Sequence, residues 1–252
     1  MNLISPAVSH RSIGLKQSVD TVVIISKSPC PRTSHVSSWR DTAGVSVFIF
    51  LFLFSSKLFA QDVVGSGAWL GLDLKHKLSK KWDINFCPQL RTLFSPLQFN
   101  SVLLEGGLDY DATKNITLSG FYRADLSVTA IQHRVYADFS FDHKFKKKIT
   151  GSIRLRAQRQ FERANIPDNY LRPKLSFKYK LTKKITPFIS GELFYHVYYK
   201  GNQFDNFRFE TGANLDLKHN RSIKAYYLLD KEFNVKAAGM QHIAGLTFGM
   251  EW

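Results

Sequence analysis

Residues 132–160 read QHRVYADFSFDHKFKKKITGSIRLRAQRQ, two segments of alternating apolar and polar side chains on either side of a basic turn. In the first segment Phe139 lies on one face, whereas Arg134 and Asp138 lie on the other. Because successive side chains of a β-strand point to opposite faces, this alternation predicts two strands that each have an apolar face and a charged face. The turn Lys146-Lys147-Lys148 joins them, so the stretch predicts a β-hairpin.

Similar basic turns recur along the chain at nearly equal intervals. The steps from Lys80 to Lys114, Lys147, Lys183 and His219 are 34, 33, 36 and 36 residues long. An interval of this length holds two strands of about a dozen residues, one tight turn and one longer loop, which is the spacing of an up-and-down β-meander. No stretch shows a convincing 3.6-residue apolar period, so we expect almost no helix. The expected strands are 67–78, 82–94, 101–111, 116–126, 132–145, 149–160, 170–181, 185–198, 206–217, 222–231 and 241–252.

Alternation alone does not decide which face of the wall points outward. A soluble secreted barrel would bury the apolar face and bind an apolar ligand, whereas a membrane barrel turns that face to lipid. Ions of both signs crowd the polar face, and aromatic residues such as Trp82 and Tyr110 lie beside the basic turns, as in an interfacial girdle. The chain ends on Trp252 with apolar residues two, four and six positions earlier, similar to the assembly signal of outer-membrane barrels. We therefore predict a closed antiparallel up-and-down transmembrane β-barrel of about 12 strands (roughly 10–12).

This fold predicts a location and a set of partners. We expect the cell outer membrane of a Gram-negative bacterium, contact with outer-membrane lipid and, through the C-terminal strand, contact with the barrel-assembly machinery. The formal net charge of +15 is dispersed among strands and turns, so we expect no nucleic-acid partner. The short turns are expected to face the periplasm, and surface recognition is expected in the longer loops on the other side. Those loops are 95–100, 127–131, 161–169, 199–205 and 232–240.

Two details do not fit a regular barrel. Eleven strands, with the short turns and Trp252 at one end, would make the first strand start at the other end. Either a strand is missing, or one is spurious, or the first and last strands pair in parallel; twelve is our preferred count and ten the next. Pro88 and Pro173 each remove a ladder hydrogen bond within an expected strand, so we expect bulges or strand ends there.

The first 60 residues are expected to be a leader that contains a signal peptide. Residues 45–54 read VSVFIFLFLF, which is shorter than the roughly 20 residues of a membrane-spanning helix and fits the core of a secretory signal. Cleavage after Ala60 would leave residues 61–252 as one outer-membrane barrel domain. Residues 1–44 are longer than the usual basic head of a signal, so we expect the true translation start to lie downstream of Met1.

A series of short motifs covers nearly all of residues 65–252. In order, they are Trp69 with Leu72 and Leu74; Leu78-Ser79-Lys80-Lys81-Trp82; Gln89-Leu90-Arg91; Gly107-Leu108-Asp109-Tyr110; Gly120-Phe121-Tyr122-Arg123; His133-Arg134; Leu171-Arg172-Pro173-Lys174-Leu175; Glu192-Leu193-Phe194; Phe207-Arg208-Phe209; and His242-Ile243-Ala244-Gly245-Leu246. The series resembles the bacterial outer-membrane family catalogued as domain of unknown function 2490. The resemblance implies an outer-membrane β-barrel, and it supplies neither an agreed activity nor catalytic residues.

Inward-facing ions are the main candidate site. One interpretation is a narrow polar path for a small solute, with an anion among the candidates. The other is a plug of mutually satisfied salt bridges, since small barrels are often filled by side chains and buried charges need partners. We therefore expect a non-enzymatic barrel, either structural or a small-solute channel, with a salt-bridged lumen. The candidate lumen residues are Arg91, Glu105, Arg123, Arg134, Asp138, Arg154, Arg156, Arg172, Glu192, Arg208 and Glu210.

An outer-membrane rim enzyme that acts on lipid is the alternative. Such a hydrolase needs a serine, a histidine and an orienting acid within hydrogen-bond reach. His133, His196, His242 and Ser127 are expected near the outer ends of strands, but only as scattered residues. The sequence contains neither a Gly-x-Ser-x-Gly elbow nor a His-Glu-x-x-His motif. It also lacks a phosphate loop, a dinucleotide fingerprint and a paired-cysteine metal motif, so we expect no catalytic residues, no cofactor and no metal.

Overall fold

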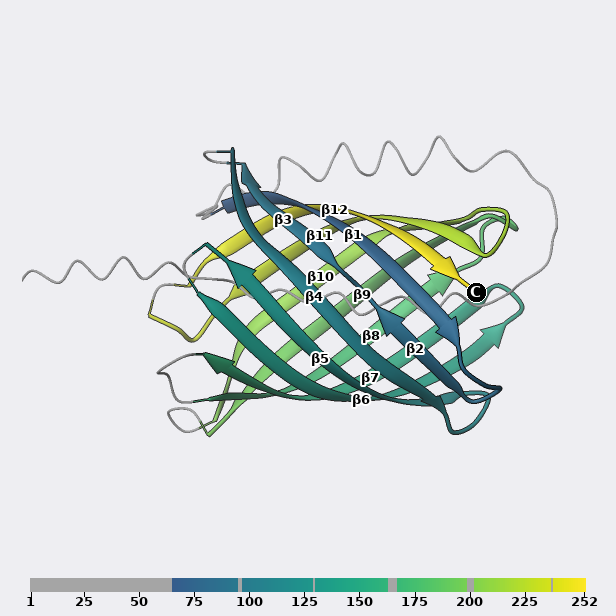
Figure 1. The fold of residues 1–252 in the computed structure, drawn as a ribbon, viewed down its shortest axis with the longest axis horizontal. Coiled ribbons are helices and arrows are strands. Elements are labelled where there is room, and N and C mark those ends of the chain that lie inside the picture. Colours follow the sequence, from purple (N-terminus) through teal and green to yellow (C-terminus); the bar gives the residue numbers. More distant parts are fainter. Residues whose placement is uncertain (1–64, 95–96, 129, 163–166, 199–201, 237) are drawn as a thin grey trace, which may run out of the picture.

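Twelve strands form one sheet that closes into a barrel (Figure 1). The computed structural model describes residues 65–252 except 95–96, 129, 163–166, 199–201 and 237, so the predicted leader lies outside the described residues. No helix in the described part of the chain is long and apolar enough to cross a membrane. The strands are β1 (Gly65–Lys77), β2 (Trp82–Phe86), β3 (Gln89–Phe94), β4 (Leu97–Asp111), β5 (Ile116–Ser127), β6 (Ile131–Lys146), β7 (Ile149–Glu162), β8 (Asp168–Tyr179), β9 (Ile185–Val197), β10 (Gln203–Asp216), β11 (Arg221–Glu232) and β12 (Met240–Glu251).

The first and last strands close the barrel by running side by side in the same direction. β1 pairs with β12 in parallel, from Gly65 opposite Gln241 to Lys75 opposite Glu251, whereas the other neighbouring strands pair antiparallel. β2 and β3 share one position in the wall, because both pair with β1 on one side and with β4 on the other. The wall therefore has eleven strand positions. An odd number of up-and-down strands gives the first and last strands the same direction, so their pairing has to be parallel.

This arrangement confirms the predicted closed up-and-down barrel and explains the difficulty with the strand count. Of the three explanations considered, parallel pairing of the first and last strands is correct. The preferred count of twelve matches the number of strands. The number of wall positions is one lower, because β2 and β3 follow one another in the single position between β1 and β4.

The two prolines have different effects. At Pro88 the predicted strand 82–94 breaks into β2 and β3, and the Pro88 carbonyl accepts a hydrogen bond from the backbone N–H of Leu72 at 2.9 Å. This break confirms the expected strand end. Pro173 lies inside β8, and the ladder between β8 and β9 keeps the same register on both sides of it. The expected bulge or strand end at Pro173 is therefore wrong, because the missing N–H interrupts the ladder without displacing the chain.

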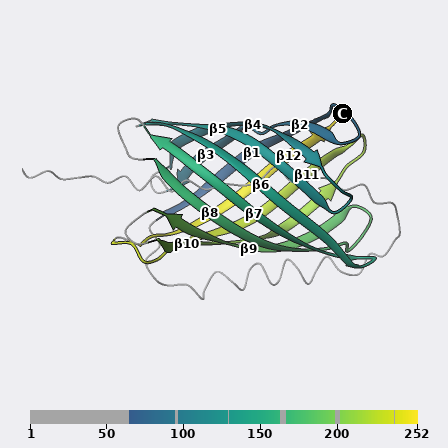
Figure 2. The ribbon, with the colours of Figure 1, turned by 90° about the horizontal axis from the view of Figure 1, so that it is seen from below.

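The short basic turns are stabilised by side chains that accept backbone hydrogen bonds. Ser79, Thr113 and Thr182 each accept, at 2.9–3.3 Å, the backbone N–H groups two and three residues further along. In the turn before β11, His219 and Asn220 have φ angles of 60° and 54°, the left-handed backbone of two-residue hairpin turns. These turns lie at one end of the barrel, and the longer connections lie at the other (Figures 1 and 2).

The wall has an apolar outer surface and a charged interior, which is the orientation expected for a membrane barrel. Leu70 is 52% exposed and Phe139 is 44% exposed on the outside, whereas Glu105 is 1% exposed on the inside. The strands are steeply tilted, and the two views show the closed wall that they form (Figures 1 and 2). Apolar residues that break the charged face of the strands are also buried inside; they are Leu103, Phe188, Phe194 and Leu228.

Candidate functional site, an ionic layer in the lumen

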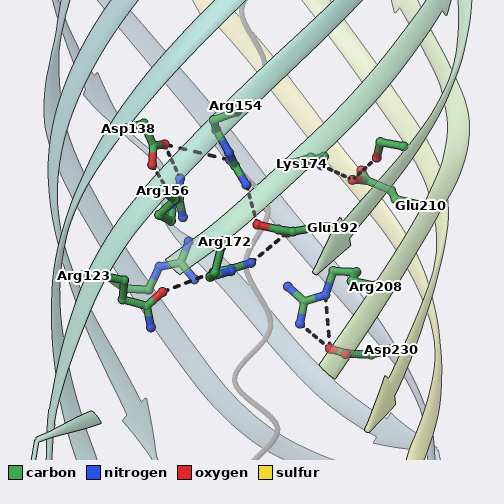
Figure 3. Close-up of polar contacts among 12 residues, drawn as sticks. Arg123, Asp138, Arg154, Arg156, Arg172, Lys174, Glu192, Arg208, Glu210 and Asp230 are labelled. Carbon is green, nitrogen blue, oxygen red and sulfur yellow. Dashed lines mark hydrogen bonds and ion pairs between the residues drawn. The ribbon is translucent and has the colours of Figure 1, made fainter. Parts of the chain in front are cut away.

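Ten buried charged side chains from six neighbouring strands meet in the lumen, and we call this set the ionic layer. The strands are β6 to β11, and all ten residues have even numbers because the antiparallel registers keep one parity facing inward. Figure 3 shows most of these side chains pointing toward one another from the surrounding wall. The ionic layer consists of Asp138, Arg154, Arg156, Arg172, Lys174, Glu192, Arg208, Glu210, Lys224 and Asp230.

Glu192 on β9 connects arginines of two other strands. Its Oε1 accepts a hydrogen bond from Arg154 Nη2 at 2.7 Å, and its Oε2 lies 2.7 Å from Arg172 Nη2 (Figure 3). Beside it, Asp138 accepts hydrogen bonds from Nε and Nη2 of Arg156, each at 2.6 Å. Charge-assisted and bidentate contacts of this kind are stronger than hydrogen bonds between neutral groups. An ion pair between Arg154 Nη1 and Asp138 at 3.9 Å connects the two groups, so side chains of β6, β7, β8 and β9 form one network.

Two more carboxylates complete the ionic layer on the side of β10 and β11. Glu210 lies between two lysines: Lys174 Nζ donates to Oε2 at 2.8 Å, and Lys224 Nζ donates to Oε1. Asp230 accepts from Arg208 Nε at 3.1 Å and also from its Nη2. The ionic layer therefore contains six cations and four carboxylates, so it carries an excess of positive charge.

Aromatic rings support the arginines from within the lumen. The guanidinium carbon of Arg172 lies 3.8 Å from the ring centroid of Phe194, and that of Arg208 lies 5.0 Å from the same centroid. Arg156 lies 3.6 Å from the ring centroid of Tyr136. Contacts of this type stabilise a desolvated cation by about 2 kcal/mol. They explain why Phe194 occupies the charged face of β9.

The side chains of the ionic layer are almost completely buried. Arg156, Arg172 and Asp230 are 0% exposed, and Glu192 is 1% exposed. Desolvation of each such ion costs on the order of several kcal/mol, so every one of them needs an opposite charge or a ring close by. The contacts above supply these partners. At this level of the barrel the lumen is filled by side chains, as in other small barrels.

The other predicted lumen residues come from β3 to β6, and they too are buried inside the barrel. Their contacts are with neighbouring polar groups: Arg91 with Asp125 (3.7 Å), Arg123 with Glu105, and Arg134 with Gln160 (3.2 Å). All eleven candidate residues therefore lie in the interior. The buried Gln158 and Gln160 are not among these candidates, although their even numbers on β7 place them on the same face as the arginines.

A polar cavity of about 150 Å³ lies beside the ionic layer, toward the short turns. Serines occupy the inward position next to an ion of the layer on three successive strands. These are Ser152 on β7, Ser176 on β8 and Ser190 on β9, and the registers place Ser176 directly opposite each of the other two. Because serine is short, space stays open here that longer side chains fill one inward position away.

Near the outer end, His196 lies between two carboxylates that sequence reasoning did not connect with it. Its Nδ1 is 3.0 Å from Asp205 and its Nε2 is 3.1 Å from Asp168. The ring also stacks on Tyr170, with centroids 4.2 Å apart. The register shifts at Asp205, and this β-bulge lets its side chain be buried, a feature that alternation alone cannot reveal.

The other residues considered for a rim enzyme have local partners. Tyr122 and the Nδ1 of His133 are hydrogen-bonded at 2.6 Å, and Tyr227 is hydrogen-bonded to the Nδ1 of His242. By the alternation of their strands, both pairs lie on the outward face of the wall. The Ser127 hydroxyl donates to a backbone carbonyl in its own loop, that of Ala130, at 2.7 Å.

Comparison with known proteins identifies the family of this chain. No curated protein matches the sequence. Among solved structures, the translocator domain of autotransporter NalP from Neisseria meningitidis is similar, with 14% sequence identity, 66% of this chain and 72% of that chain covered, and a TM-score of 0.44. A family model described as "Protein of unknown function (DUF2490)" matches residues 66–241. With its closed β-barrel and this match over most of its length, the chain belongs to the DUF2490 family.

Proposed function

We propose that the protein is a non-enzymatic β-barrel of the outer membrane whose lumen is closed by the ionic layer. The observation that carries this proposal is the burial of the ion pairs: Arg172 and Glu192 lie in the lumen with 0% and 1% of their surface exposed. A pore for solutes needs a continuous hydrated path, and ions along such a path would retain contact with water. The barrel would then act as a structural element of the membrane or as a carrier for its loops, rather than as an open channel.

The outer surface supports the location in a membrane. Large apolar side chains are exposed on strands all around the wall, and examples are Leu72, Leu118, Val135, Leu155, Ile189 and Leu246. An exterior of this kind is stable in contact with lipid, and it would aggregate in water. At the short-turn end Trp82 packs against Tyr110 with centroids 4.8 Å apart, in the position where interfacial rings are favoured. A soluble barrel would need the apolar side chains inside.

Single-channel recording in a planar bilayer tests whether the barrel is closed. We expect no conductance steps from the wild-type protein. Replacing Arg154, Arg172 and Glu192 together by alanine should produce steps, because three long side chains would then be missing from the ionic layer. The matched control is Arg159→Ala, an exposed arginine on the outward face of β7, which should stay silent. Reproducible steps from the wild-type protein would contradict a closed barrel and favour a small-solute channel.

A lipid hydrolysis assay tests the non-enzymatic part of the proposal. We expect the folded protein, checked by its heat-dependent shift on a denaturing gel, to release no fatty acid from outer-membrane lipid. Support for this expectation comes from the hydrogen bonds of His133 and His242 to tyrosines. Fatty-acid release that disappears in Ser127→Ala, His133→Ala or His242→Ala would instead establish a rim enzyme.

A further inference from the structure

We propose that the cavity between the ionic layer and the short turns is a binding site for a small oxyanion of the size of inorganic phosphate. The cavity has a volume of about 150 Å³ and is lined by hydroxyls, cations and engaged carboxylates. The ionic layer closes it on one side. A ligand would therefore enter and leave through the short-turn end, which makes the cavity a one-ended site instead of a path through the barrel.

Hydroxyl groups form the wall of the site. Ser152, Ser176 and Ser190 lie opposite one another on β7, β8 and β9, and Thr117, Ser119 and Ser140 contribute further hydroxyls from β5 and β6. A hydroxyl can donate one hydrogen bond and accept two. Three of these hydroxyls already donate to carboxylates, those of Thr117, Ser152 and Ser190. The hydroxyls of Ser119, Ser140 and Ser176 are the ones that can donate to a ligand. This lining suits a compact ligand that has several oxygen atoms.

Two buried arginines that line the cavity have donors without a hydrogen-bond partner. Arg154 is 7% exposed, and its Nε and Nη1 have no hydrogen-bond partner among the described residues. Its Nη1 is 3.9 Å from Asp138, which is too long for a hydrogen bond. The Nη1 of Arg156 likewise has no hydrogen-bond partner within the described part of the chain. Buried donors are normally satisfied, so an acceptor is expected at this place.

The carboxylates that line the cavity are already engaged. Asp138 accepts two hydrogen bonds from Arg156, and Glu210 lies between two lysines. Asp142 accepts from Ser152, and Asp109 accepts from Asn85 at 3.0 Å. Each of these carboxylates therefore already has a donor, whereas Arg154 and Arg156 have donors without a partner. Together with the excess of cations in the ionic layer, this selects an anion over a cation or a neutral sugar.

The volume limits the size of the ligand. A cavity of about this volume has room for a ligand of about six heavy atoms. A tetrahedral oxyanion has five heavy atoms and fits this space. Its oxygens can accept hydrogen bonds from the two arginines and from Ser176.

Equilibrium dialysis with radiolabelled inorganic phosphate against the detergent-solubilised protein, in a buffer of low chloride, tests the proposal. We expect saturable binding of one phosphate per barrel. Arg154→Gln should weaken the affinity at least tenfold, and Glu192 keeps Arg172 as a partner in this variant. Ser176→Phe should abolish binding by filling the cavity while the contacts of the ionic layer stay in place. Arg159→Gln is the matched control and should bind like the wild type.

Two outcomes would overturn the proposal. If the wild-type protein shows no saturable phosphate binding, the cavity holds only water. If binding survives unchanged in both Arg154→Gln and Ser176→Phe, the phosphate lies elsewhere on the protein. The heat-dependent gel shift identifies any variant that fails to fold, and Ser176→Phe then decides the result if Arg154→Gln is lost. Neither outcome depends on whether the barrel conducts, so the closed-barrel proposal stands or falls separately.

Discussion

The ionic layer and the cavity beside it are built by the same strands, and a shift of two residues along each strand separates them. On β7 the change is from Arg154 to Ser152, and on β9 it is from Glu192 to Ser190. Long ions in register interlock across the lumen, whereas serines in register leave a space of about 150 Å³. Side-chain length at one inward position therefore decides whether this barrel is closed or hollow at a given level.

Removing the carboxylate of Glu192, which contacts two arginines of the ionic layer, should cause the largest loss of stability. Glu192→Ala leaves Arg154 and Arg172 buried without their shared partner, and the expected loss in the free energy of unfolding is about 3–5 kcal/mol. Ser190→Ala, one inward position away, should change it by less than about 1 kcal/mol. Urea unfolding in lipid vesicles, followed by tryptophan fluorescence, measures both. Equal losses for the two variants would show that the ionic layer is no more important for stability than the cavity wall.

The second largest loss of stability is expected when a large side chain is added where the lumen is already filled. At Gly245 an added Cβ would lie 2.0 Å from the ring of Tyr226, so Gly245→Leu forces this buried ring to move. We expect a loss of about 1–3 kcal/mol from overpacking. In Ser176→Leu the larger side chain has the cavity to occupy, so the expected loss in the free energy of unfolding is less than about 1 kcal/mol. The same unfolding assay compares them, and a larger loss for Ser176→Leu would mean that the cavity is not open.

Replacing the ring between two arginines should give a smaller effect. Phe194→Leu keeps an apolar side chain of similar volume and removes the cation–π contacts with Arg172 and Arg208. The expected loss is about 1–2 kcal/mol. Phe161, which lies on the outward face of β7, provides the matched variant Phe161→Leu, with an expected change below about 1 kcal/mol. Unfolding curves that cannot be told apart would contradict a stabilising role for the ring.

An ion pair with an exposed lysine at the short-turn end should contribute least. Lys77 lies 2.5 Å from Glu251, and its side chain is 55% exposed. Solvent screens such a pair, so Lys77→Ala should lower the free energy of unfolding by no more than about 0.5 kcal/mol, and the difference should vanish in high salt. The loss caused by Glu192→Ala should persist in the same salt, because buried pairs are screened much less. Repeating both measurements at low and high ionic strength checks this difference.

Much of the wall was predictable because its signals are local. The alternation in residues 132–160 gave both faces of β6 and β7, and turn residues such as Thr113 and Thr182 marked the hairpins. The eleven lumen candidates followed from parity together with the expectation that the apolar face points outward. Pro173 was harder, since a missing hydrogen bond does not by itself tell whether the chain shifts. Asp205 was missed as the partner of His196, because one extra residue in a strand reverses the parity and leaves no sign in the pattern.

By itself, the sequence determined an all-β meander with apolar and charged faces, because alternation and turn chemistry act between residues that are close along the chain. Only the tertiary structure decided that β1 and β12 pair in parallel, which ions meet in the ionic layer, and where the lumen stays empty. These features depend on the register between strands that are far apart in the sequence. The physical reason is that closing the barrel sets the level of each inward side chain, and this level selects its partners.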